Sequence, residues 1–316
     1  MRRGRFGRLV GSAVQAVMAA LCVFNFAMTP YFECQLDGDS CNERVSAMAG
    51  IFARSVSITC LVTVVVAWQK YRGATAEYRE RAELSDAYTT SAASAKPCYV
   101  GRATVAGVVL FTCLALIVPV NAYRLFRFFL DDRSAVVIVY FVLMYSQNLY
   151  VCFYETHFVQ LFYALYTRFS DLNRDMEAIG KRIEDGRRAR DEPSPGRDGW
   201  ILNDVGDEHR PHYLYYYSSA TGQPLVDAVE RLRVKHRLVR EAVDALKPAF
   251  ALPMGLSLCN LCVMFLFDVY YHLKNSVEHP AGDLATVYIF MWVAQYTFRF
   301  FIITMTVDIT IKQASR

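Results

Sequence analysis

Long apolar runs, each of about 20 residues or more, dominate the hydrophobic pattern of this 316-residue chain. A helix needs about 20 residues to cross the roughly 30 Å apolar core of a bilayer. The pattern therefore predicts an all-α protein, a polytopic membrane helical bundle with about six transmembrane helices. These predicted transmembrane helices lie at 9–31, 46–68, 101–124, 135–166, 246–273 and 284–310.

The connections between the apolar runs differ in charge. The first eight residues contain four arginines and no acidic residue, whereas the connection 33–44 contains four acidic residues and one arginine. The loop after the second run is basic again, with Lys70, Arg72 and Arg79. Because basic connections tend to remain cytoplasmic, we expect a multi-pass membrane protein with a cytoplasmic N-terminus. A signal peptide is the alternative for the first run, although its apolar part would be only about 7–15 residues long.

The stretch 167–245 separates the first four predicted transmembrane helices (1–166) from the last two (246–316). Its part at 184–210 is rich in glycine, proline and charge, which predicts a disordered linker. On both sides, apolar residues continue at helical steps, including an amphipathic helix at 225–246. Because an apolar stripe has to be buried, we expect inner extensions of the fourth to sixth helices to form a cytoplasmic anchor. Its packing residues are expected to be Arg168, Phe169, Leu172, Asn173, Met176, Leu232, His236 and Val239.

Ionisable residues inside the apolar runs are candidates for functional or paired groups. Glu155 and Arg299 both lie in the inner halves of their runs, which favours a structural ion pair between them. Asp268 lies near the outer end of the fifth run, where Arg124 and Lys274 are candidate partners.

The outer halves of the third to sixth runs contain many aromatic and amide side chains. Some of these residues fit an interfacial aromatic belt. Others lie deeper than a belt requires, and aromatic and amide groups that face one cavity would form a small-molecule pocket. The candidates for this pocket are Asn121, Tyr145, Gln147, Tyr271, Tyr288, Trp292 and Gln295.

Catalytic and metal-binding motifs are absent from the sequence, so we expect neither enzyme activity nor a metal or cofactor. The net charge of +4 comes without a basic stripe, which argues against a nucleic-acid partner. Cys34 and Cys41 share one predicted outer loop, where a disulfide between them is a candidate.

Two segments resemble insect and other arthropod gustatory receptors. The segment "LYTRFSDLNRDM" is similar to the inner end of that family's fourth helix, through Arg168, Phe169, Leu172 and Asn173. The segment from Leu232 to Leu273 resembles the stretch that leads through the family's fifth helix, and the resemblance covers most of 100–310 in pattern. The residues that carry this second match are Leu232, His236, Val239, Phe250 and Tyr271.

The resemblance implies a subunit of a ligand-gated, non-selective cation channel that detects small-molecule tastants in the plasma membrane of taste neurons. It implies seven helices per subunit and a homo- or hetero-tetramer with other gustatory receptor subunits. This chain ends at Arg316, after the sixth run, so we expect a truncated form without the pore-lining seventh helix. The alternatives are a non-conducting regulatory partner of full-length receptors and a secondary transporter.

Overall fold

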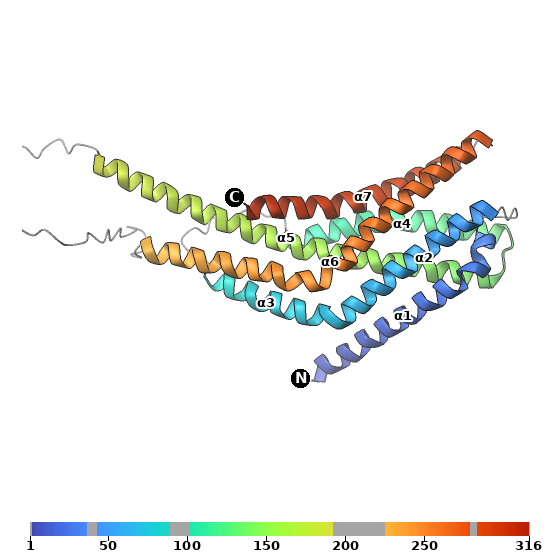
Figure 1. Cartoon of the computed structure of the whole chain (residues 1–316), viewed down its shortest axis with the longest axis horizontal. Helices are drawn as coiled ribbons and strands as arrows, with labels where there is room; N and C mark the ends of the chain where they lie inside the picture. Colours follow the sequence, from blue (N-terminus) through green and yellow to red (C-terminus); the bar gives the residue numbers. More distant parts are fainter. Residues whose placement is uncertain (1, 37–42, 89–100, 192–224, 279–282, 316) are drawn as a thin grey trace, which may run out of the picture.

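The computed structural model describes residues 2–36, 43–88, 101–191, 225–278 and 283–315, and these are almost entirely helical (Figure 1). No β-strand occurs among them. The elements in chain order are α1 (Arg2–Leu36), α2 (Glu43–Val66), the π-helical turn η1 (Ala67–Tyr71), α3 (Arg72–Ala87), α4 (Arg102–Leu130), α5 (Ala135–Asp191), α6 (Leu225–Glu278) and α7 (Asp283–Ala314).

Six of the helical segments are long and apolar enough to cross a membrane, which confirms the predicted all-α fold. All six predicted runs fall on these segments. The segments are Val10–Phe32, Gly50–Ala87, Ala103–Leu130, Ala135–Asp185, Leu225–Tyr270 and Phe290–Ala314.

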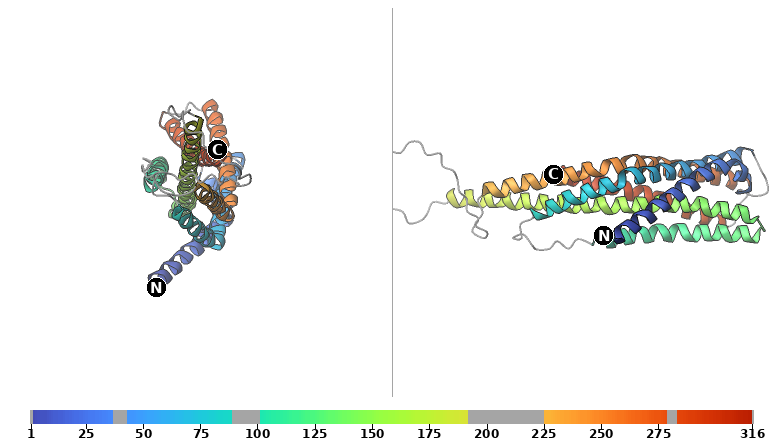
Figure 2. Two further views of the ribbon diagram at one scale, coloured as in Figure 1. Left: turned by 90° about the vertical axis from the view of Figure 1, so that its left-hand side faces the viewer. Right: turned by 90° about the horizontal axis from the view of Figure 1, so that it is seen from below.

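The helices form one elongated bundle with two different ends (Figures 1 and 2). One end of the bundle, which we name the loop end, contains the last turns of α1, α4 and α6 and the first turns of α2, α5 and α7. The helices α3, α5 and α6 reach towards the opposite end, which we name the extension end. Both chain termini lie away from the loop end.

Two segments differ from the sequence-based prediction. The basic stretch after the second run is not a loop, because the helix continues from α2 through η1 to the end of α3 at Ala87. The first part of the predicted linker, 184–191, belongs to helix α5. The rest of that linker and the predicted Cys34–Cys41 disulfide lie outside the described residues and side chains.

Helix α6 and the continuous helix α2–η1–α3 both change direction along their length (Figure 1). In α6 the cause is Pro248 and Pro253, since proline lacks the N–H that would bond the carbonyl four residues earlier. Pro253 thus frees the carbonyl of Ala249, which accepts a 2.7 Å hydrogen bond from the Tyr154 hydroxyl of α5. In the other helix the π-turn η1 widens the backbone ladder. Tyr71 of η1 is hydrogen-bonded to His157 of α5.

Candidate functional site

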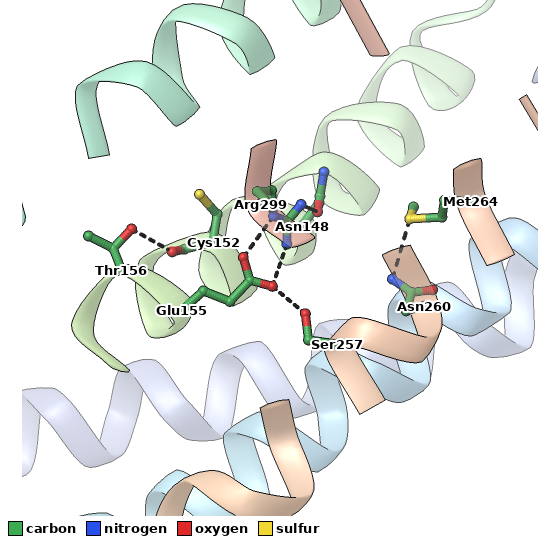
Figure 3. Close-up of polar contacts among 8 residues, drawn as sticks. All are labelled: Asn148, Cys152, Glu155, Thr156, Ser257, Asn260, Met264 and Arg299. Carbon is green, nitrogen blue, oxygen red and sulfur yellow. Dashed lines mark hydrogen bonds and ion pairs between the residues drawn. The ribbon is translucent and has the colours of Figure 1, made fainter. Parts of the chain in front are cut away.

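A buried ion pair between α5 and α7 is hydrogen-bonded to α6 as well (Figure 3). Arg299 of α7 binds both carboxylate oxygens of Glu155 of α5, through Nε at 2.7 Å and Nη2 at 2.8 Å. Its remaining Nη1 donates to Oδ1 of Asn148 at 2.8 Å, and Ser257 of α6 donates to the Glu155 carboxylate. Arg299 is 2% exposed and Glu155 is 4% exposed. The predicted ion pair is therefore confirmed, and its geometry is the two-point fork that arginine forms with carboxylates.

A second polar contact, nearer the loop end, fastens α1 and α2 to α5. Gln147 is fully buried; its amide accepts from Ser57 Oγ at 3.0 Å and donates to the carbonyl of Leu21 at 3.1 Å. Both amide atoms of Gln147 are thus bound to the protein. The structure gives this predicted pocket residue a packing role between helices.

Aromatic side chains of α5 and α7 meet near the loop end. Trp292 lies 5.7 Å from Tyr145 and 5.5 Å from Tyr296, measured between ring centroids. Tyr145 in turn contacts Phe141 at 4.4 Å. The guanidinium of Arg124 on α4 lies 5.5 Å from the centroid of the Phe141 ring, and its Nη1 is 3.5 Å from the Tyr145 hydroxyl. We name these five residues the loop-end aromatic cluster.

Two predicted pocket residues, Tyr145 and Trp292, therefore come together in one cluster. Arg124 was predicted only as a partner of Asp268, and its stacking on aromatic rings from another helix could not be read from the sequence. Asp268 lies close enough to Arg124 and to the Tyr296 hydroxyl to interact with both groups. The cluster thus combines aromatic rings with the positive group of Arg124, and the acidic Asp268 lies beside it.

Gln295 of α7 is fully buried beside this cluster, three residues after Trp292. Neither its amide nitrogen nor its amide oxygen has a hydrogen-bond partner among the described residues. Asn121 of α4 is half-buried and donates to the carbonyl of Ile117 at 2.8 Å, while its Oδ1 is likewise unpartnered. Buried amides are usually satisfied, so these unpartnered amide groups are the candidates in this region for binding a polar ligand. The side chains of Tyr271 and Tyr288 lie outside the described ones.

At the extension end, Arg168 ties α5 to α3. Its Nε and Nη2 bind the two carboxylate oxygens of Asp86 at 3.2 and 2.9 Å, and its Nη1 donates to the Tyr78 hydroxyl at 3.0 Å. Sequence reasoning missed α3 as a member of this bundle. The sequence does contain a pattern that indicates this helix, because its buried residues recur at helical steps: Ala74, Tyr78, Ala82 and Ser85.

The other three residues of the first family-like segment also fasten α5 at this end. Phe169 and Leu172 are buried, and Phe169 belongs to the same apolar core as Val239 of α6. Asn173 donates a 2.7 Å hydrogen bond to the carbonyl of Gln313, near the end of α7. We name the packed region of α3, α5, α6 and α7 at this end the extension-end bundle; its core includes Tyr78, Ala82, Phe169, Val239, Ala242 and Leu246.

Two of the predicted anchor residues, His236 and Met176, are exposed and do not pack in the extension-end bundle. His236 is exposed, whereas the preceding residue, Lys235, is 4% exposed and forms a 2.8 Å ion pair with Asp175 of α5. Met176 is also exposed within the single chain, and Leu232 is half-buried. The buried face of α6 therefore runs through Lys235 and Val239 instead of His236.

The described residues contain no group of three or more His, Cys, Asp or Glu side chains arranged to hold a metal ion. Two pairs of free buried cysteines lie within hydrogen-bonding reach of each other, Cys22 with Cys60 and Cys113 with Cys152. Each pair sits in an apolar core, where cysteine acts as a small packing side chain.

No protein-family model matches the chain, and no curated protein matches it significantly.

Proposed function

We propose that this chain is a gustatory-receptor-like subunit of a ligand-gated, non-selective cation channel in the plasma membrane of taste neurons. The observation that carries the proposal is the loop-end aromatic cluster with the unpartnered amide of Gln295 beside it. Flat aromatic walls with a few polar groups are typical of small-molecule sites. In this proposal the cluster binds a small-molecule tastant.

The arrangement of the helices supports a path from such a site to the extension end. Helices α5 and α6 are each continuous over more than fifty residues, at 57 and 54 residues. The Glu155–Arg299 pair links α5 to α7 between the cluster and the extension-end bundle. A ligand that shifts α7 at Trp292 would therefore also act on α5. In this proposal the extension-end bundle supports assembly into homo- or hetero-tetramers with other gustatory receptor subunits.

Ligand-evoked calcium entry into cells that express the chain tests this function. The cells would be exposed to sucrose, caffeine, denatonium and single amino acids, with and without a co-expressed gustatory receptor subunit. Trp292→Ala should weaken the response by at least about tenfold in ligand concentration, since a stacked aromatic contact and its buried area are lost. Phe126→Ala is the matched control, because Phe126 is 57% exposed on α4 and outside the cluster.

The outcomes separate the candidate functions. Calcium entry from the chain alone supports a channel subunit. A response that depends on the co-expressed subunit, and is modified by Trp292→Ala in this chain, supports a regulatory partner. Ligand uptake without cation current would support a transporter, and no ligand effect in any arm contradicts the chemosensory proposal.

A further inference from the structure

Gln295 is a buried amide whose nitrogen and oxygen both lack a hydrogen-bond partner among the described residues. Its side chain is 0% exposed, so solvent does not satisfy these atoms either. Trp292 lies three residues before it and Arg299 four residues after it, which are the spacings of neighbours on one face of a helix. Since buried amides in native proteins are nearly always hydrogen-bonded, this exception calls for a functional explanation.

The side chain of Gln295 leans towards the aromatic cluster. Helix side chains are inclined towards the N-terminal end of their helix, and the first turn of α7 lies at the loop end (Figure 1). The amide therefore lies on the Trp292 side of its own backbone position. On that side the rings of Trp292 and Tyr296 are stacked, with an interplanar angle of 26°. The amide thus adjoins flat aromatic surfaces.

Two further amide oxygens are unpartnered within the described part of the chain, and they belong to the helices that pack against α7. They are Oδ1 of Asn121 on α4 and Oδ1 of Asn260 on α6. Their chain neighbours, Val120 and Leu261, share one apolar core with Trp292. Both amide nitrogens donate within their own helices, and Figure 3 shows this bond for Asn260. The atoms that remain are therefore acceptors.

The charged groups near this amide are already paired. Arg299 donates through Nε and Nη2 to Glu155 and through Nη1 to Asn148. Arg124 interacts with the acidic Asp268. A charged ligand would have to compete with these pairs for its counter-charge, and an unpaired charge is costly in an apolar core. The surroundings therefore favour an uncharged ligand.

We propose that Gln295 makes the site selective for uncharged, flat rings in which a carbonyl group and an N–H group are adjacent, as in a lactam. The ligand carbonyl accepts from Nε2 of Gln295 and the ligand N–H donates to Oε1, so the two amides bond at two points. The ring stacks on Trp292, and the two asparagine oxygens accept any further N–H groups of the ligand. This inference rests on the proposed function, because it names the ligand class of the same site.

Binding of matched lactams to the reconstituted chain tests the inference. The probes are 2-pyridone and 2-quinolone, each compared with its N-methyl derivative. Binding is measured by equilibrium dialysis against phosphatidylcholine vesicles that contain the full chain, and empty vesicles correct for partition into lipid. Methylation removes the N–H and places a methyl group against Oε1 of Gln295. At least one lactam should therefore bind at least about tenfold more tightly than its N-methyl derivative.

Two glutamine substitutions provide the matched comparison. Gln295→Leu should abolish the preference for the lactam. It should not lower the sodium dodecyl sulfate concentration at which half of the protein unfolds, because it removes an amide that bonds nothing in the protein. Gln147→Leu is the control at another fully buried glutamine, whose amide bonds Ser57 and the carbonyl of Leu21. It should lower that concentration and leave the preference for the lactam unchanged.

Several outcomes would overturn the inference. These are equal binding of the lactams and their N-methyl derivatives, a preference that survives Gln295→Leu, and no binding of any probe. A loss of stability in Gln295→Leu as large as that in Gln147→Leu would also overturn it, since the amide would then be bonded within the protein. Failure of the proposed function is a separate result: lactam binding that evokes no calcium entry in any arm would contradict the channel while the ligand class stands.

Discussion

Removing one member of the Glu155–Arg299 pair should be far more destabilising than removing both. The pair is almost fully buried, and Arg299 also bonds Asn148 while Glu155 accepts from Ser257. Glu155→Met leaves the guanidinium without a counter-charge, and Arg299→Met leaves the carboxylate without one. The double substitution leaves neither charge behind.

The magnitude follows from burial. Breaking a buried ion pair on one side costs about 3–5 kcal/mol, whereas replacing both partners by apolar residues of similar size is often neutral. Glu155→Met should lower the free energy of unfolding more than Arg299→Met does. Glu155→Met leaves a buried arginine, which cannot lose its proton, whereas Arg299→Met leaves a carboxyl group, which can become neutral by gaining one. The double variant should be within about 1–2 kcal/mol of the unmodified chain, with the loss arising from the unpaired Asn148 and Ser257 side chains.

The assay is unfolding in mixed micelles with increasing sodium dodecyl sulfate, followed by far-ultraviolet circular dichroism. A double-mutant cycle gives the coupling free energy between the two positions. The control pair is Glu177 with Lys181, one turn apart on α5 and both about 70% exposed; its removal should change the unfolding free energy by less than about 0.5 kcal/mol. If the two single losses simply add in the double variant, the buried pair is not the connection that the structure indicates.

Two further substitutions test contacts that hold α5 in place, each by the same unfolding assay. Arg168→Gln should lower the free energy of unfolding by about 1–3 kcal/mol, since it removes a two-point contact to α3 and a hydrogen bond. If this decrease is no larger than that of the exposed Lys181→Gln, the contact between Arg168 and α3 does not stabilise the protein. Tyr154→Phe should cost about 1–3 kcal/mol, because the Ala249 carbonyl freed by proline then has no donor. Tyr270→Phe, at a hydroxyl-bearing residue that is 53% exposed on α6, should be nearly neutral, and equal losses at the two tyrosines would contradict the argument.

The transmembrane helices could be predicted because burial in lipid needs long runs of apolar residues, and composition reveals such runs directly. The partnership of Glu155 with Arg299 could be predicted for a related reason: a charge inside an apolar run requires a partner, and few others are at a similar depth. Helix α3 was missed because its outward face is strongly charged, so the four-residue spacing of small buried residues such as Ala74 and Ala82 was hidden among polar neighbours.

Contacts between distant segments explain the remaining differences. Apolar residues at three- and four-residue steps predict that a segment is a helix, but they do not decide which of two neighbouring residues faces the core. The buried position on α6 is Lys235 instead of His236 because the lysine ammonium reaches Asp175, sixty positions earlier. In the same way, Gln147 looked like a pocket residue because its partners, Ser57 and the Leu21 carbonyl, belong to helices far away in the sequence.

The emission of Trp292 reports whether a small-molecule tastant binds at the loop-end aromatic cluster, as we propose. Trp68→Phe with Trp200→Phe leaves Trp292 as the sole tryptophan. The reconstituted variant would be titrated with whichever compound evokes calcium entry. We expect a saturable change in Trp292 emission whose midpoint matches that of calcium entry. Unchanged Trp292 emission at concentrations that evoke calcium entry would show that the compound does not bind at this cluster.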